Sequence, residues 1–428
     1  MSGRNNRMAL NYVWIAFFLI GLVIALIKLI VFHDYEIFKK LVDGIFDASK
    51  SSVMDVALPL TGVMVFFMGL MNIGEKAGAV NFLARLLNPF MKRLFPEVPD
   101  KHPAMGQMVM NFSANMLGLD NAATPFGLKA MESLQTLNPN KETATNAQIM
   151  FLVLHTSGLT LIPLSIIAYR AGAGSTNPTS VFIPLMLATA IATIASIIIT
   201  GIYQRLKFDI VLITWLGTMI VGIGLFAFFM WHLPSQKDFA TPVLLTKETF
   251  GNVLGNLILF VLIAAFIIGG LIKKINVFDA FIEGAKGGWE VIVKIIPYLV
   301  GMLVAIRVFR DSGALTAVIN GISWALNSLG VGGDYVAALP VAIMRPFSGA
   351  GARGLMLDIF TNPAYGPDSF VGKMASTFQG SADTTFYILA LYFGSVGIKK
   401  VRYAIWAGML ADFIGVIAAI LIAYLMMR

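Results

Sequence analysis

Cysteine is absent from this chain of 428 residues, and charged residues make up only 13% of it. Without cysteine there is no disulfide framework and no thiol chemistry. A soluble domain of this size carries about 25% charged residues, so the scarcity of charge argues against a soluble protein. Histidine is also rare, and His33, His102, His155 and His232 do not have metal-ligand spacing.

The chain is rich in long apolar runs. Hydrophobic residues make up 57% of the chain, and its mean hydropathy is +0.80. Runs of about 20 apolar residues, long enough to cross a bilayer, recur along the sequence. We therefore predict an all-α polytopic membrane protein whose first partner is the lipid bilayer. The nine predicted spans are roughly 10–32, 53–73, 148–170, 181–203, 209–231, 254–272, 291–309, 373–396 and 403–426. We interpret the first as a retained anchor, because no small-residue cleavage site follows it.

Two stretches, 76–140 and 313–370, are moderately apolar but are interrupted by Gly, Pro and polar residues. The first contains "NFSANMLGLDNAATPFGLKAM" (111–131). Polar groups survive at membrane depth only where protein or a water-filled cavity satisfies them. Asp and Asn followed by "AATP" suit a helix start. We predict two re-entrant hairpins of half-helices, one interrupted near 118–124 and the other within 341–360.

Basic residues orient the spans, because Lys and Arg concentrate in cytoplasmic loops. Nine spans place four basic clusters on one side, which puts the N-terminus in the cytoplasm and the C-terminus outside. The same bias accounts for the net charge of +8 without nucleic acid, and we find no nucleic-acid-binding module. The clusters are Arg4 with Arg7, Arg205 with Lys207, Lys273 with Lys274, and Lys399 and Lys400 with Arg402.

The two halves of the chain resemble each other. "VDGIFDASKSSVMDVALPLTG" (42–62) resembles "IEGAKGGWEVIVKIIPYLVG" (282–301). Further on, Gly78-Ala79 matches Gly313-Ala314 and Phe112-Ser113 matches Phe347-Ser348, both 235 positions apart. The span 209–231 lies between the halves and would invert the second copy. Inverted repeats with interrupted helices are the architecture of secondary transporters, whose site lies near the midplane.

The stretch "PFSGAGARG" (346–354) places Gly349, Gly351 and Gly354 at the G-x-G-x-x-G spacing of a dinucleotide-binding turn. That turn requires a preceding strand and an acidic residue about 20 positions later. Here a membrane hairpin precedes the glycines, and Asp358 and Asp368 are too close. No P-loop is present, so we do not expect ATP hydrolysis. Glycines at the start of a half-helix can instead present backbone N–H groups to a negative charge.

The motif "NFSANMLGLDNAATPFGLKAM" resembles the signature of spore maturation protein A. "RPFSGAGARG", "FQGSADTTFYILALYFGSVGIKKVRYA" and the final "ADFIGV" resemble spore maturation protein B. The two resemblances cover nearly the whole chain, which would be a fusion of the two. Both belong to the nucleoside-recognition, or Gate, superfamily, together with concentrative nucleoside transporters and Feo-type ferrous-iron permeases. The resemblance implies a helical-hairpin transporter core in a bacterial cytoplasmic (inner) membrane and leaves the substrate open.

This resemblance divides the chain into a first Gate-like repeat (1–208), an inverting helix with an external loop (209–250) and a second Gate-like repeat (251–428). Candidate substrate-binding residues lie in the interrupted segments and in the polar eighth span. Arginines there can instead snorkel or pair with Asp334 or Asp358, and Asp383 can bind solute or pair with a hairpin arginine. The candidates are Asn111, Ser113, Asn115, Asn121, Thr124, Arg345, Ser348, Gly349, Gly351, Arg353, Gln379, Ser381, Asp383 and Thr384.

Three further polar residues, His155, Ser157 and Asp412, are candidates for ion coupling or for structure. His155 titrates near neutrality and could carry a proton, or it could be a satisfied core residue. We predict that Ser113, Asn115, Asn121, Ser348, Gln379 and Asp383 line one central cavity.

The predicted function is secondary transport of a small polar organic solute, with carboxylates among the candidates, coupled to Na⁺ or H⁺ and without a resident cofactor or metal. A non-transporting scaffold of envelope or spore maturation and an intramembrane enzyme are the alternatives. "PFSGAG" is not the GxSxG elbow of a serine hydrolase. The chain is not predicted to be an enzyme, and a homo-oligomer stays open.

Overall fold

The computed structural model describes residues 2–99, 101–118, 120–234 and 246–427, without the side chains of 2–11, 13, 120–122 and 248. Within these residues every regular element is a helix, and a single parallel bridge joins Thr143 to Lys400. The predicted all-α class is therefore confirmed.

Seven helices are long and apolar enough to cross a membrane, and they fall on seven of the predicted spans. The second of them is continuous through a π-helical turn, η1. The seven are α1 (Ser2–Phe32), α2 (Ile37–Ser51) with η1 (Ser52–Ala57) and α3 (Leu58–Ala77), α9 (Phe182–Gln204), α10 (Ile210–His232), α11 (Lys247–Ile272), α12 (Val277–Asp311) and α18 (Ala404–Met426).

Two of the nine predicted spans are not full helices, and here the prediction was wrong. The span 148–170 is divided into α7 (Asn146–Ser157) and α8 (Leu164–Gly172), and 373–396 into α16 (Phe370–Gly380) and α17 (Thr385–Ser395). Gly158 ends α7 in the left-handed region with φ +54°. Long apolar flanks hide both breaks, because hydropathy is averaged over a window longer than the interruption.

Both predicted hairpins are present. In the first, α5 (Pro103–Met116) packs against α6 (Asp120–Leu137). At its tip Gly118 has φ +71°, and a Cβ there would lie 2.8 Å from the carbonyl oxygen of Ile162, so only glycine fits. The second hairpin consists of the 3₁₀ turn η3 (Asp334–Ala338), α14 (Leu339–Met344) and α15 (Gly349–Thr361), and its helix is interrupted at 345–348.

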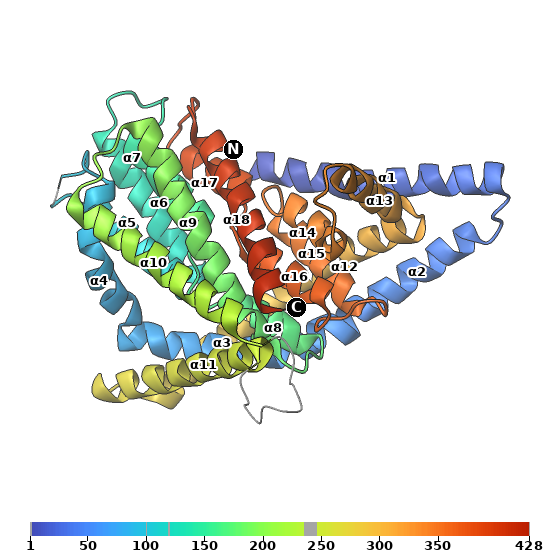
Figure 1. Cartoon of the computed structure of the whole chain (residues 1–428), viewed down its shortest axis with the longest axis horizontal. Helices are drawn as coiled ribbons and strands as arrows, with labels where there is room; N and C mark the ends of the chain where they lie inside the picture. The colour runs from blue at the N-terminus through green and yellow to red at the C-terminus, as the bar shows by residue number, and fades with distance from the viewer. Residues whose placement is uncertain (1, 100, 119, 235–245, 428) are drawn as a thin grey trace.

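Elements recur in the same order in the two halves. Left-handed glycines, Gly78 (φ +88°) and Gly313 (φ +95°), end the long helices α3 and α12. The helices α4 (Ala79–Leu94) and α13 (Ala314–Ser328) follow them. The long helices pack against each other, as do α9 and α18, while α11 packs on α3 and α1 on α12 (Figure 1). Residues of the two halves therefore pack together in the same hydrophobic clusters. The domain boundaries at 208 and 250 stay predictions.

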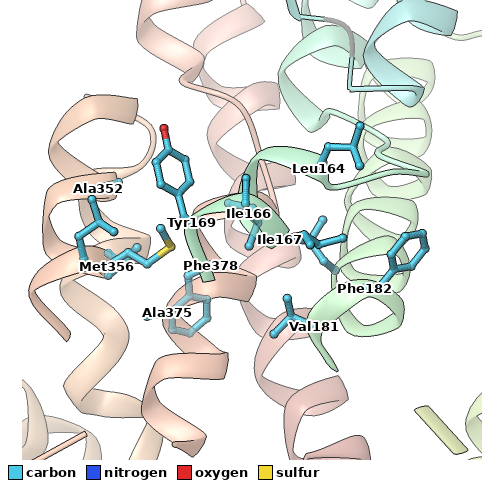
Figure 2. Close-up of a cluster of buried hydrophobic side chains, with 14 of the residues drawn as sticks. Leu164, Ile166, Ile167, Tyr169, Val181, Phe182, Ala352, Met356, Ala375 and Phe378 are labelled. Carbon is cyan, nitrogen blue, oxygen red and sulfur yellow. The ribbon is translucent and has the colours of Figure 1, made fainter. Parts of the chain in front are cut away.

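The short half-helix α8 is held in place by apolar packing. Figure 2 shows Ile166 and Ile167 of α8 among side chains of α9, α15 and α16, including Phe182, Met356 and Phe378. All five side chains are buried. Burying such a side chain contributes about 1.5–3 kcal/mol. A segment of nine residues could not stay helical alone, so this packing fixes α8 beside the second hairpin.

Candidate functional site

A cavity of about 660 Å³ lies where the two hairpin tips meet the two helix breaks. Four residues of the convergence prediction line it, namely Asn115, Ser348, Gln379 and Asp383. Ser113 does not line it, and the side chain of Asn121 lies outside the described residues. Six further candidates also line the cavity: Thr124, His155, Arg345, Gly349, Arg353 and Thr384.

Backbone hydrogen bonds hold each hairpin tip against the helix break of its own half. The carbonyl of Met116 accepts from the N–H groups of Leu161 and Ile162, at 2.8 and 3.3 Å. In the second half, the carbonyl of Pro346 accepts from the N–H of Phe386 at 3.1 Å. These bonds satisfy backbone groups that a helix break would leave unpaired at membrane depth.

The two helix breaks are also joined to each other. The N–H of Asp383 donates to the carbonyl of Thr156 at 2.8 Å. A frame of backbone hydrogen bonds that draws on both halves of the chain therefore borders the cavity.

Asp383 lies between a guanidinium and an imidazole. Its Oδ1 is 3.7 Å from Nη2 of Arg345, and its Oδ2 is 3.7 Å from Nε2 of His155. The carboxyl is 38% exposed, while His155 is only 3% exposed. Arg345 also donates to the carbonyl of Ala382 at 2.7 Å and to the hydroxyl of Thr384 at 3.3 Å. The predicted pairing of Asp383 with a hairpin arginine is thus present.

The other predicted partner of the hairpin arginines, Asp358, is paired elsewhere. Its carboxylate accepts from Arg310 of the long helix α12. The alternative in which Asp358 pairs with Arg345 or Arg353 is therefore not present in the structure. Asp358 is on the buried face of α15 and meets α12 there, a contact between distant segments that sequence spacing does not show.

Arg353 and Gln379 bring unsatisfied polar atoms to the cavity. The guanidinium of Arg353 lies 5.1 Å above the ring of Tyr169, and its buried Nε has no hydrogen-bond partner among the described residues. Gln379 donates to the carbonyl of Gly349 at 3.3 Å, while its buried Oε1 has no partner in that same part of the chain. Buried polar atoms without partners are rare in folded proteins, so these two atoms mark unused hydrogen-bonding capacity at the cavity.

Asn111 lies behind the cavity lining and positions His155, which lines the cavity. Asn111 is fully buried and does not line the cavity. Its Nδ2 donates to the carbonyl of Ala123 at 2.6 Å, and its Oδ1 is 3.0 Å from Nδ1 of His155. Tyr392, which sequence reasoning missed, lies against both residues and occupies the space beside Gly127, where a Cβ would meet its hydroxyl.

Other candidate side chains form hydrogen bonds with groups of the protein itself. The hydroxyl of Ser348 accepts from the N–H of Gly351 at 3.0 Å and so caps α15. Asp412 accepts from the hydroxyl of Thr385 at 2.6 Å, and its second oxygen has no partner among the described residues. The remaining three hydroxyls, none of which lines the cavity, donate to helix carbonyls one turn back: Ser113 to Val109, Ser157 to Leu154 and Ser381 to Phe378.

Four aromatic side chains line the cavity and were not among the candidate binding residues: Tyr169, Tyr298, Phe347 and Tyr387. Aromatic residues are as common in an apolar core as in a binding site, so no sequence signal separates them. They give the cavity an apolar portion beside its charged one, as small-molecule sites have.

Beyond the cavity, two junctions tie loops of one half to loops of the other. In the arginine junction, fully buried Arg170 pairs with Asp368 at 2.9 Å. Burial alone would raise the pKa of Asp368, but hydrogen bonds from Ser175 and Thr176 and the charge of Arg170 lower it. Arg170 also donates to the carbonyls of Pro178, Pro367 and Asn177 and to the hydroxyls of Ser175, Ser180 and Ser376.

In the lysine junction, Lys399 pairs with Glu142 at 2.5 Å, and both side chains are exposed. The hydrogen bond and charge of Lys399 lower the pKa of Glu142. Backbone bonds reinforce this junction, because the N–H groups of Lys399 and Lys400 both donate to the carbonyl of Glu142 at 2.9 Å.

Comparison with known proteins identifies the family. The Gate family, described as nucleoside recognition, matches residues 57–173 and 292–399, more than half of the chain. Spore maturation protein B of Bacillus subtilis (strain 168) is 48% identical over 166 residues, which cover 39% of this chain and 90% of that protein. Spore maturation protein A of the same strain is 39% identical over 198 residues, 46% of this chain and 97% of that protein.

No solved structure matches. The two matched regions contain both hairpin tips and both helix breaks, so the family match and the cavity coincide. The chain therefore belongs to the Gate family of membrane proteins and unites relatives of spore maturation proteins A and B in one polypeptide.

Proposed function

We propose that this protein is a secondary transporter that moves a small polar organic solute with an anionic group through the central cavity. One observation carries the proposal: each half of an apolar fold contributes a hairpin tip and a helix break to a single polar cavity. Irregular backbone at membrane depth is tolerated where it lines such a cavity, and transporter sites are built this way.

The anionic group follows from the second hairpin. Arg345 and Arg353 line the cavity, and α15 begins beside them at Gly349. A guanidinium suits bidentate binding of a carboxylate, and the N-terminus of a helix favours negative charge. In this structure Asp383 pairs with Arg345. This pair would separate when the anionic group of the solute binds Arg345.

The proposal includes orientation and coupling. The N-terminus and the loops at 204–208, 273–276 and 398–402 would face the cytoplasm and the C-terminus the outside of a bacterial cytoplasmic membrane, because those loops carry the basic residues. Na⁺ or H⁺ would be the coupling ion, with His155 and Asp412 as the groups that could respond to it.

A non-transporting scaffold is the second candidate, because both named relatives are spore maturation proteins. An intramembrane enzyme has less support. The hydroxyl of Ser348 already caps α15, and the described residues show no hydrogen bond between Ser348 and His155 that would activate it.

Access to the cavity from both sides of the membrane distinguishes a transporter from a scaffold. The chain has no cysteine, so a single cysteine can be placed at Ala350, which lines the cavity. Ala350→Cys should react with a membrane-impermeant thiol reagent from either side, tested in right-side-out and inside-out vesicles. Ala352→Cys, fully buried on the same helix, is the matched control and should stay unreactive. Reaction of Ala350→Cys from one side only would contradict alternating access.

A further inference from the structure

The hydrogen-bonding direction of His155 can be assigned from its neighbours. The carbonyl of Ala123 can only accept, so the Asn111 atom 2.6 Å from it must be the amide nitrogen. The oxygen of Asn111 therefore faces Nδ1 of His155, at 3.0 Å. An oxygen acceptor at that distance requires Nδ1 to carry the proton.

With Nδ1 protonated, the opposite nitrogen of a neutral imidazole is an acceptor. Burial favours the neutral ring, and His155 is only 3% exposed. Its Nε2 then presents a lone pair toward Oδ2 of Asp383, 3.7 Å away. Two acceptors facing each other across the cavity wall need a donor between them.

Two neighbours of the ring fit this assignment. Nδ2 of Asn115 lies 2.9 Å from Nδ1, and the Asn115 side chain has no other hydrogen bond among the described residues, so its amide can turn its oxygen to the ring. The hydroxyl of Tyr392 lies 3.3 Å from Nδ1 and 3.5 Å from Nε2. A hydroxyl nearly equidistant from both nitrogens is not aligned with the lone pair of either.

A third acceptor lines the same cavity. Oε1 of Gln379 is buried and has no hydrogen-bond partner in the described part of the chain, and the residue is 4% exposed. Gln379, Asp383 and His155 thus offer acceptors, whereas Arg345 and Arg353 offer donors. The cavity is therefore complementary to a solute that has a donor group as well as an anionic group.

The carboxylate of Asp383 identifies the kind of donor. Arg345 and Arg353 bring positive charge to the cavity, and Asp383 brings the negative charge that a cationic donor would meet. Because Asp383 is a carboxylate, an ammonium gains more there than a hydroxyl.

We propose that the solute is a zwitterionic amino acid, whose ammonium lies between His155 and Asp383 and whose carboxylate binds Arg345 and Arg353. This inference rests on the proposed function and names its substrate class. The aromatic lining and the size of the cavity leave room for a large apolar side chain.

Matched ligands test the inference on the purified full-length protein in nanodiscs. The probes are phenylalanine, 3-phenyllactate and 3-phenylpropionate, which differ at one substituent, together with alanine, lactate and propionate as a smaller set. Isothermal titration should show the amino acid binding at least about tenfold more tightly than the acid without a donor, with the hydroxy acid between them. Asp383→Asn should remove most of this difference, whereas the control Asp47→Asn, at an exposed site, should change nothing.

The outcomes separate the inference from the proposed function. Equal affinity for the amino acid and the donor-free acid would overturn the inference and leave the carboxylate site standing. Binding of the neutral nucleoside uridine with no binding of any acid would overturn both. A preference for the amino acid that survives Asp383→Asn would show that the donor is bound elsewhere, which also contradicts the inference.

Discussion

The two halves of this protein form the same backbone frame at the cavity but line it with different side chains. In each half a hairpin tip bonds to a helix break through a backbone carbonyl, Met116 in the first and Pro346 in the second. The first half then presents neutral groups to the cavity, Asn115 and His155, whereas the second presents Arg345 and Asp383. The comparison teaches that the frame depends on backbone geometry, while the charged side chains at the cavity come from the second half.

The loop junctions differ in a parallel way. Buried Arg170 has a full set of partners, while exposed Lys399 has one carboxylate and backbone support. Exposed ion pairs contribute about 0–1 kcal/mol, but removing one member of a buried pair costs about 3–5 kcal/mol. We expect stability to depend on the arginine junction far more than on the lysine junction.

The largest predicted effect follows from that difference. Arg170→Met should lower the free energy of unfolding by about 3–5 kcal/mol, because it leaves buried carbonyls without their donor and removes the positive charge that pairs with Asp368. Thermal denaturation of the purified protein and its monodisperse yield measure this loss. Lys399→Met is the matched control and should cost at most about 1 kcal/mol. Equal losses in the two variants would show that the junctions are equivalent.

The next largest effect on stability is expected at the tip of the first hairpin. Gly118→Ala should destabilise by about 2–3 kcal/mol, because it adds the cost of a left-handed residue and a contact with the carbonyl of Ile162. Gly174→Ala is the control, since Gly174 is also left-handed (φ +76°) but has no atom within 4 Å of the added Cβ. The difference in melting temperature between the variants isolates the close approach. Identical values would mean that the tip is not held against the break.

The charged side of the cavity should matter more for transport than the neutral side. Arg345→Lys keeps the charge but loses the planar fork, so uptake into proteoliposomes should fall about tenfold while the melting temperature holds. Asn115→Ala, from the other half, should reduce uptake by only about threefold. A larger loss for Asn115→Ala would reverse the proposed division of roles.

The smallest effect is a dependence on pH. The pKa of Asp368 is lowered in the folded protein, so the folded state favours its ionised form. The associated stability is present above the ordinary value of about 3.9 and is lost as pH falls through the lowered folded-state pKa. Melting temperatures between pH 6 and 3 should therefore fall less steeply for Asp368→Asn than for the wild type. Parallel curves would contradict the assignment.

Sequence patterns predicted the fold where the signal was local. Apolar length gave the seven long helices, and the clusters of Gly, Pro and polar residues gave both hairpins. The helix breaks after Ser157 and Gly380 were missed, because apolar neighbours mask short interruptions. Arg170 and Tyr392 were missed for a different reason: their partners, such as Asp368 and Asn111, lie far away in the sequence, and only the packed structure brings them together.

The most direct test of the central claim is an experimental structure of the protein with a bound carboxylate solute. The account predicts density between the two hairpin tips, with the carboxylate on Arg345 or Arg353 and the rest of the solute toward His155 of the other half. Density outside this cavity, or solute held by one half alone, would contradict the claim that the two halves form one transport site.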